Sequence, residues 1–213
     1  MDIGVYGGTF DPIHLGHLIM AEEARLRLNF EKVLFAPARN PWMKSKWVIS
    51  SPQHRLAMLK LAIASNPFFQ ISTVDLENPG PSFTVDTLSA LKQQFGPGPS
   101  GANLYFILGV DSLRDVPYWR EPHNIVKYGK MVALARPGFD EPDWGSLDKA
   151  IPNARDNILL LKNPLIDISS TEVRRRVSQG LSVRYLVPEA VERYISENGL
   201  YRPQPGGTCD QDL

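Results

Sequence analysis

Apolar residues near the start of the chain follow two different periods. Residues 3–6 and 32–36 are short, mostly apolar runs of the kind that form buried strands. Between them, from Leu15 to about Leu28, apolar residues recur roughly at every third or fourth position, which predicts a helix. A strand, a helix and a second strand in so short a stretch are typical of a parallel βαβ unit.

The same alternation continues along the chain. Ser51 followed by Pro52 is typical of an N-cap and a first helical residue, so we expect a helix from there to about Ser65. Residues 96–101, rich in glycine and proline, predict a loop, and Gly180 and Gly199 predict the ends of the last two helices. Further predicted strands are 69–76, 104–108, 131–135 and 158–161, and further predicted helices are 85–95, 170–179 and 188–198.

This order of elements predicts an α/β fold with a doubly wound parallel sheet, in which ligands bind at the carboxyl ends of the strands. A length of 213 residues suits one core, so we expect a single domain over residues 1–202 and a frayed tail over 203–213. Lysine plus arginine (23) equals aspartate plus glutamate (23), so no overall basic field indicates a nucleic-acid partner.

Cysteine use and the lack of long apolar stretches bear on location. The single cysteine, Cys209, lies in the predicted tail, which excludes a disulfide within the chain and suits a reducing compartment. The first residues lack a basic and apolar signal segment, and no apolar stretch is long enough to span a bilayer. We therefore expect a cytoplasmic protein without membrane attachment, and a homo-oligomer stays possible.

A glycine-rich turn directly after the first predicted strand carries the first candidate chemistry. Gly7 and Gly8 let backbone N–H groups approach a phosphate without an intervening Cβ. The next helix begins near His14, so its positive dipole end faces the same place. His14 and His17 share one helical face and can donate hydrogen bonds to phosphate oxygens, whose charge favours the protonated rings.

Each part of this turn also has a purely structural interpretation. A glycine pair can be an ordinary turn, a single histidine is usually structural, and His-x-x-His can bind a metal, although no third ligand lies nearby in sequence. The turn matches neither the P-loop nor the dinucleotide-binding pattern. The whole stretch from Gly7 to His17 resembles the signature of the HxGH nucleotidyltransferase superfamily. That resemblance implies a Rossmann-like fold with C-terminal helices that transfers a nucleoside monophosphate from a triphosphate and releases pyrophosphate.

A second motif lies about 150 residues further on, from Ile168 to Arg174. Ser169 and Glu172 have the spacing of a capping box, and Arg174 lies in the first turns, where a cation is unfavourable unless an anion is close. Taken alone, an ordinary capped surface helix explains this segment better. It also resembles the Ile-Ser-Ser-Thr-x-x-Arg signature of the same superfamily, whose serines and arginine contact triphosphate oxygens.

Within this superfamily, nearly the whole chain resembles the bacterial nicotinate-nucleotide adenylyltransferases. The segments that carry the resemblance are 22–24, 32–38, 54–55, 82–88, 109–113 and Trp119. The resemblance implies ATP and nicotinate mononucleotide as substrates, with nicotinate adenine dinucleotide and pyrophosphate as products. It also implies a Mg²⁺ ion that bridges the ATP phosphates and is held mainly by substrate.

The same resemblance implies roles for particular residues. Thr84 is expected to offer a backbone N–H and a hydroxyl to the nicotinate carboxylate, and Trp119 to stack on the pyridine ring. Trp119 could instead be a core or interface residue. The expected catalytic residues are His14, His17 and Arg174; the expected ATP-binding residues are Gly7, Gly8, Thr9, Phe10, Lys44, Gly109, Asp111, Ser169 and Ser170; and the expected nicotinate-nucleotide-binding residues are Thr84, Trp119 and Arg136. No residue is expected to bind a metal directly.

One position departs from the family pattern, and three alternatives stay open. Met43 stands where many members have histidine, so a phosphate contact there would come from Lys44 or the backbone; Lys44 and Arg136 could each be solvated surface charges. A nicotinamide-nucleotide adenylyltransferase differs only in the exocyclic group that its substrate carries. A phosphopantetheine adenylyltransferase is usually shorter and lacks the 82–87 and Trp119 features. A non-catalytic nucleotide-binding protein would not need His14, His17 and Arg174 intact.

Overall fold

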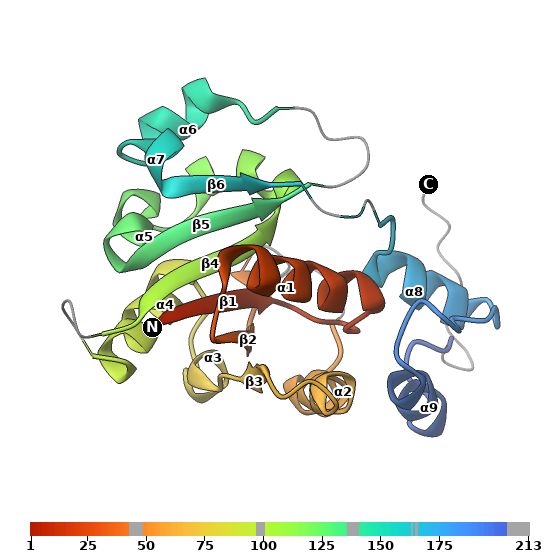
Figure 1. Ribbon diagram of the computed structural model, residues 1–213. Helices are drawn as coiled ribbons and strands as arrows, with labels where there is room; N and C mark the ends of the chain where they lie inside the picture. Colours follow the sequence, from red (N-terminus) through yellow and green to blue (C-terminus); the bar gives the residue numbers. More distant parts are fainter. Residues whose placement is uncertain (43–48, 97–100, 136–140, 163, 165, 204–213) are drawn as a thin grey trace.

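The computed structural model describes residues 1–42, 49–96, 101–135, 141–162, 164 and 166–203 (Figure 1). Within these residues the centre is a six-stranded sheet in the order β3-β2-β1-β4-β5-β6, with every strand pair parallel. The strands are β1 (Asp2–Gly8), β2 (Lys32–Pro37), β3 (Phe69–Ile71), β4 (Asn103–Gly109), β5 (Gly129–Leu134) and β6 (Ile158–Leu161). The doubly wound parallel sheet that the sequence predicts is thereby confirmed.

Helices cover both faces of this sheet. They are α1 (Leu15–Leu28), α2 (Pro52–Ile63), α3 (Val74–Glu77), α4 (Thr84–Gln94), α5 (Pro122–Tyr128), α6 (Trp144–Ala150), α7 (Ala154–Asn157), α8 (Ser170–Ser178) and α9 (Glu189–Glu197), with 3₁₀ turns η2 (Val110–Arg114) and η3 (Val116–Tyr118). Apolar residues of α1, α2, α8 and α9 belong to one buried cluster, and those of α4 to α7 belong to a second. Neighbouring strand residues alternate between them, as Tyr6 and Val5 do, because side chains along a strand point to opposite faces.

The predicted strand 69–76 is wrong beyond Ile71. The chain pairs with β2 only through Ile71, opposite Phe35, and then turns into the short helix α3. Two residues further, the strand would have to pair with Pro37 at the end of β2, and proline has no N–H to donate. Helices α5, α6 and α7 were not predicted because each has seven residues or fewer, too few to show a helical period.

The strand order places a ligand-binding crevice beside β1. From β1 the chain continues to β2 on one side, and β4 starts the other half of the sheet, so the loops after β1 and β4 diverge. A Cβ at Gly7 would come within 2.8 Å of the Phe106 ring on β4, so glycine lets the two strand ends lie close together. The arrowheads of β5 and β6 point toward the side on which α8 and α9 lie (Figure 1).

The ends of the last two helices agree with the sequence. Gly180 and Gly199, just after α8 and α9, have φ of 69° and 59°, the left-handed conformation that glycine adopts without strain. No helix of the described ranges is long and apolar enough to cross a lipid bilayer.

Candidate functional site

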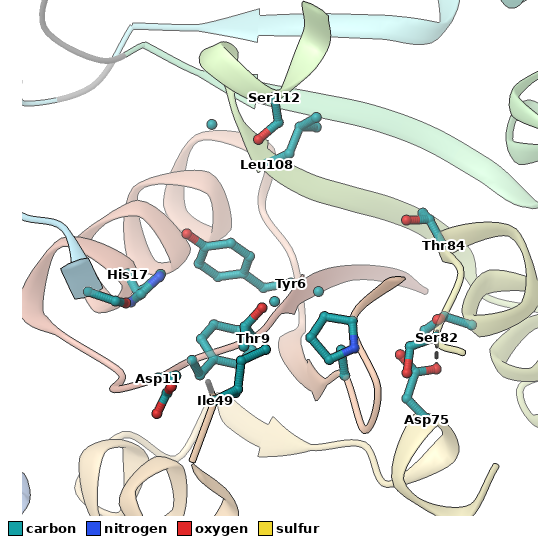
Figure 2. A pocket seen from close by; sticks show the side chains of 18 of the residues that line it. Tyr6, Thr9, Asp11, His17, Ile49, Asp75, Ser82, Thr84, Leu108 and Ser112 are labelled. Carbon is teal, nitrogen blue, oxygen red and sulfur yellow. Dashed lines mark hydrogen bonds between the residues drawn. The ribbon is translucent and has the colours of Figure 1, made fainter. Parts of the chain in front are cut away.

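A cavity of about 390 Å³ lies at the carboxyl ends of β1 and β4 (Figure 2). The lining comes from the loop after β1, the starts of α1, α4 and α8, and the turn after β4. It includes the predicted residues Gly7, Gly8, Thr9, Phe10, His14, His17, Thr84, Gly109, Asp111, Trp119, Ser169, Ser170 and Arg174. Lys44, Arg136 and Met43 lie outside the described residues.

Two ends of this cavity can be distinguished. We call the end formed by residues 7–11, His14, His17, Ser169, Ser170 and Arg174 the α1–α8 end. The end formed by Asp75, Ser82, Thr84 and Trp119 is the α4 end. In Figure 2, His17 lies on one side of the cavity, whereas Asp75, Ser82 and Thr84 lie together on the opposite side.

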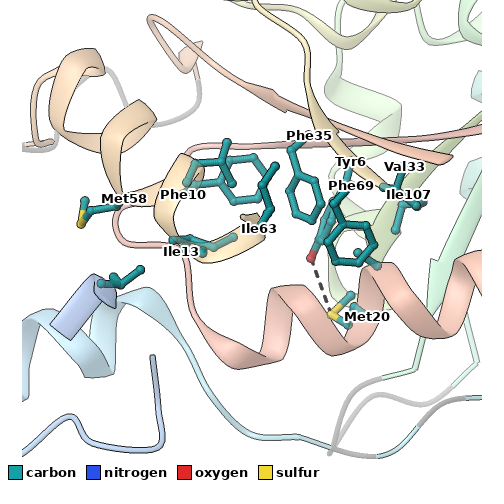
Figure 3. Close-up of a cluster of buried hydrophobic side chains, with 14 of the residues drawn as sticks. Tyr6, Phe10, Ile13, Met20, Val33, Phe35, Met58, Ile63, Phe69 and Ile107 are labelled. Carbon is teal, nitrogen blue, oxygen red and sulfur yellow. Dashed lines mark hydrogen bonds between the residues drawn. The ribbon is translucent and has the colours of Figure 1, made fainter. Parts of the chain in front are cut away.

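The loop after β1 is anchored in the core by Phe10. Its ring is 2% exposed, and it makes an edge contact with Tyr6 at 5.6 Å between centroids and a tilted contact with Phe35 at 5.7 Å (Figure 3). Phe10 has a φ of 50°, which turns the backbone sharply after Thr9. The Phe10 ring thus packs in the core, and the predicted contact of Phe10 with ATP stays a prediction.

His14 and His17 form a reciprocal cap at the start of α1. The backbone N–H of His14 donates to Nδ1 of His17 at 3.2 Å, and that of His17 donates to Nδ1 of His14 at 3.4 Å. The two rings stack with centroids 3.6 Å apart. A Cβ at Gly16 would come within 3.1 Å of the His14 ring, so glycine makes room for this arrangement.

These capping bonds decide which nitrogen can donate. An Nδ1 that accepts a hydrogen bond carries no proton, so the proton of each neutral ring is on Nε2. In the neutral form each imidazole can therefore donate from Nε2, and both rings line the cavity.

Helix α8 brings the second motif onto the first. The Ser170 hydroxyl donates to the carbonyl of Pro12 at 2.9 Å, and Arg174 Nη1 donates to the carbonyl of Asp11 at 2.7 Å. Ser169 caps the helix, with its hydroxyl accepting from the N–H of Glu172 at 3.1 Å. Two segments about 160 residues apart in sequence thus form one surface.

The predicted capping box at α8 is only half present. Glu172 oxygens accept from Arg175 at 2.7 Å and from Arg176 at 2.8 Å, so within the described chain they do not return to the Ser169 N–H. The bond from Arg175, followed by that from Arg176, lowers the pKa of Glu172 to about 2. Arg174 is the arginine of this run that turns toward the cavity.

Arg55 is a buried residue beside the cavity, for which the sequence predicted no role beyond the family resemblance of 54–55. It is 1% exposed and donates to four carbonyls, those of Thr9 at 2.9 Å, Ala38 at 2.6 Å, Arg39 at 3.0 Å and Ser50 at 3.0 Å. Burial lowers the pKa of the guanidinium, and the Asp11 charge partly offsets this. One side chain therefore fixes the loop after β1, the end of β2 and the start of α2.

Asp11 and Tyr201 complete this buried network. Asp11 is 3% exposed; its Oδ2 accepts from the N–H of Ser50 at 3.1 Å and its Oδ1 from the Tyr201 hydroxyl at 2.7 Å. Burial, followed by the Asp11 charge, raises the pKa of Tyr201 well above its usual range, so Tyr201 stays a donor. The segment after α9 thereby holds the loop after β1.

At the α4 end, one buried hydrogen-bond donor has no partner among the described residues. Helix α4 begins after Phe83 with no side-chain cap among the described residues. No capping side chain there accepts from the N–H groups of its first turn, to which Thr84 belongs. Trp119 packs its ring edge-on against Phe106, and its Nε1 is buried with no partner in the described chain. Gly109, the last residue of β4, and Asp111 in η2 also line the cavity.

Asp75 is a second residue that the sequence did not single out. It lies in α3, where a strand was expected, and lines the cavity near Ser82 and Thr84 (Figure 2). Its Oδ1 accepts from the Thr87 hydroxyl at 2.7 Å. Burial raises the pKa of Asp75 to about 6, and the nearby Asp86 charge adds to this against the Thr87 bond.

Carboxylates at the cavity do not gather into a metal site of their own. Over the described parts of the chain, no three His, Cys, Asp or Glu side chains come together in a way that could hold a metal ion. Both oxygens of Asp11 already accept hydrogen bonds, and Asp75 lies at the α4 end.

The chain is similar to a family model and to several curated proteins. The model described as cytidylyltransferase-like matches residues 5–176. A protein of Thermomicrobium roseum, named a probable nicotinate-nucleotide adenylyltransferase, is 46% identical over 200 residues, which cover 94% of this chain and 91% of that protein. A protein of the same name from Moorella thermoacetica is 38% identical over 213 residues, covering 98% and 95% of the two chains.

The fold is also similar to solved structures. Plasmodium falciparum nicotinic acid mononucleotide adenylyltransferase complexed with NaAD superposes with a TM-score of 0.75 at 22% identity, over 94% of this chain and 97% of that chain. The same protein complexed with APC has a TM-score of 0.73 at 23% identity, over 94% and 96% of the two chains. At these identities the similarity shows the fold.

Proposed function

This chain belongs to the cytidylyltransferase-like family and, within it, to the nicotinate-nucleotide adenylyltransferases, and on that premise we propose that it transfers AMP from ATP to nicotinate mononucleotide. The products are nicotinate adenine dinucleotide and pyrophosphate, a step of NAD biosynthesis. The two substrates occupy the two ends of one cavity, ATP phosphates at the α1–α8 end and the pyridine ring at the α4 end.

One observation carries this proposal. Ser170 and Arg174 donate to the carbonyls of Pro12 and Asp11, so two helix N-termini, α1 and α8, converge on the same side of the cavity. Helix N-termini favour anions because their first N–H groups are unpaired and the helix dipole is positive there. The convergence supports a site for a polyanion, and a triphosphate fits it.

The reaction needs charge stabilisation more than it needs a base. The attacking group is the phosphate of the mononucleotide, which is largely dianionic near neutral pH because its second pKa is about 6. It attacks the α-phosphorus of ATP, and the bond to the pyrophosphate oxygen breaks. Catalysis therefore consists of holding two polyanions in line and stabilising charge on the transferring and leaving oxygens.

The side chains of the α1–α8 end suit that task. His14 and His17 donate from Nε2 to phosphate oxygens. The remaining N–H groups of Arg174, the Ser169 hydroxyl, the backbone N–H of Ser170 and the N–H groups from Gly7 to Phe10 donate to the rest of the triphosphate. The buried network of Arg55, Asp11 and Tyr201 keeps these donors in place before substrate arrives. Lys44 stays a predicted contact of the ATP phosphates, and Arg136 a predicted contact of the nicotinate nucleotide.

The α4 end suits the acceptor. Thr84 offers its N–H and hydroxyl to the nicotinate carboxylate, and Trp119 stacks on the pyridine ring. Gly109 and Asp111 lie where a carboxylate and a backbone N–H can bind ribose hydroxyls. A Mg²⁺ ion held mainly by the ATP phosphates and water would neutralise charge on the leaving pyrophosphate.

Three broader expectations from the sequence stay predictions. They are the cytoplasmic location, the possible homo-oligomer and the extent of the domain over residues 1–202.

A pyrophosphate-release assay tests the proposed reaction. ATP and Mg²⁺ are offered with nicotinate mononucleotide, nicotinamide mononucleotide or phosphopantetheine in parallel. We expect release with nicotinate mononucleotide and a product with the mass of nicotinate adenine dinucleotide. Release with phosphopantetheine alone would replace the proposed acceptor, and no release with any of the three would indicate a non-catalytic nucleotide-binding protein.

A further inference from the structure

The Asp75 carboxyl group lies close to the place proposed for the substrate carboxylate. Asp75 accepts from the hydroxyl of Thr87 at 2.7 Å, and Thr87 lies three residues after Thr84 in α4. Residues three apart on a helix are neighbours, roughly 5–6 Å apart between Cβ atoms. Both Asp75 and Thr84 line the cavity, and they lie on the same side of it in Figure 2.

One oxygen of Asp75 is already engaged and the other is available. The Thr87 hydroxyl also lies 3.1 Å from the carbonyl of Phe83, so its proton is shared between that oxygen and Oδ1 of Asp75. Oδ1 can accept this bond whether or not the acid is ionised. Oδ2 has no hydrogen-bond partner in the described part of the chain, so it accepts from a ligand when ionised and donates when protonated.

The charges around Asp75 leave it without an ionic partner among the described residues. On α4, Asp86 pairs with Arg120 at 3.2 Å. Arg39, two residues after β2, donates from Nη1 to the carbonyl of Leu76 at 3.0 Å, and Glu77 of α3 accepts from the Thr73 hydroxyl at 2.6 Å. Burial, with Asp86, raises the pKa of Asp75 to about 6, so its charge changes between mildly acidic and neutral solution.

We propose that Asp75 is a specificity-determining residue that distinguishes a carboxylate from a carboxamide on the pyridine ring of the acceptor. This inference rests on the proposed function. When neutral, Asp75 donates a hydrogen bond from Oδ2 to the nicotinate carboxylate. When ionised, it repels that carboxylate but accepts a hydrogen bond from the –NH₂ of nicotinamide. The preference for the acid over the amide therefore falls as the pH rises.

The ratio of kcat/KM for nicotinate mononucleotide to kcat/KM for nicotinamide mononucleotide tests this. Both acceptors carry the same phosphate and react with the same ATP, so ionisations common to the two reactions cancel in the ratio. Between pH 5.5 and 8 we expect the wild-type ratio to fall by about tenfold or more, since like charges a few ångströms apart repel strongly in a partly desolvated site.

Asp75→Asn should remove this pH dependence. Asparagine keeps an oxygen for the Thr87 hydroxyl and presents an –NH₂ that stays uncharged, so the ratio should be flat with pH and above the wild-type ratio at pH 8. Glu77→Gln is the matched control, since it removes an exposed carboxylate from the same helix and should leave the wild-type slope unchanged.

Different results overturn different statements. A wild-type ratio that does not change with pH, or an equal slope in Asp75→Asn, would show that Asp75 does not face the substrate carboxylate. If Asp75→Asn does not fold, the pH dependence of the wild-type kcat/KM ratio tests the proposal on its own. A protein that releases no pyrophosphate with either acceptor at any pH would instead overturn the proposed function.

Discussion

The α1–α8 end and the α4 end of the cavity are built in different ways. At the α1–α8 end, the site residues are already bonded to the protein: the histidines cap each other, and Ser170 and Arg174 hold backbone carbonyls. At the α4 end, helix α4 has no side-chain cap in the described residues and the Trp119 Nε1 is buried without a partner there. A buried donor without a partner is unfavourable by roughly 1–3 kcal/mol, and a ligand that supplies the acceptor removes this penalty.

The difference matches the two tasks that we propose. Charge on transferring phosphate oxygens is best stabilised by donors that do not reorganise during the reaction. Recognition of a substrate, in contrast, gains from groups whose hydrogen bonds only the correct ligand can complete. Changes at the α1–α8 end should therefore lower turnover, and changes at the α4 end should weaken acceptor binding.

The largest effect is expected for His17→Ala. Loss of one preorganised donor to the phosphates should lower kcat on the order of 10²-fold or more, with little change in the KM for the acceptor. Steady-state pyrophosphate release measures this, and a thermal melt checks the fold. His54→Ala is the control, because His54 bonds to the Tyr194 hydroxyl at 2.9 Å and does not line the cavity. Near-normal turnover in folded His17→Ala would refute the catalytic role.

An intermediate effect is expected for Tyr201→Phe. It removes the bond to Asp11 and leaves a buried carboxylate oxygen unpaired, so the free energy of unfolding should fall by about 1–3 kcal/mol. Because Asp11 belongs to the loop after β1, kcat should also fall, by roughly tenfold, while the KM for the acceptor stays unchanged.

Tyr194→Phe separates positioning from stability. Tyr194 is another C-terminal tyrosine with a side-chain hydrogen bond, and its partner His54 lies away from the cavity. We expect a loss of stability with normal turnover. If both tyrosine variants lowered kcat equally, the network of Arg55, Asp11 and Tyr201 would have no special role in positioning.

The smallest effect on turnover is expected for Trp119→Ala. Loss of the stacking ring should raise the KM for nicotinate mononucleotide roughly tenfold, with the KM for ATP and kcat close to wild type. Trp144→Ala is the control, since Trp144 stacks on Arg155 outside the cavity. A change confined to ATP would mean that Trp119 is not part of the acceptor site.

The sequence predicted most of the sheet and singled out the two motifs that meet at the α1–α8 end, because their signals are local. A strand followed by two glycines, and a capped helix followed by Arg174, can be recognised within ten residues. Residues such as Gly16, whose missing side chain makes room for the His14 ring, are part of the same short pattern.

Residues that act over long distances in sequence were not predicted. Arg55 was noticed only as part of the family resemblance, because its four carbonyl partners come from residues 9 to 50 and leave no periodic signal. Tyr201 was assigned to the end of the domain next to a tail. Asp75 lies in α3 and not in the predicted strand 69–76. The residues of that segment do not reveal that the neighbouring strand β2 ends at a proline.

A pre-steady-state measurement of the first turnover tests the division between the two ends most directly. The rate of adenylyl transfer is followed with ATP and nicotinate mononucleotide both saturating, for wild type, His17→Ala and Trp119→Ala. Saturation should restore Trp119→Ala to within a few-fold of the wild-type rate, whereas His17→Ala should stay slower by on the order of 10²-fold. A Trp119→Ala enzyme that stays as slow as His17→Ala at saturation would contradict the assignment of binding to one end and catalysis to the other.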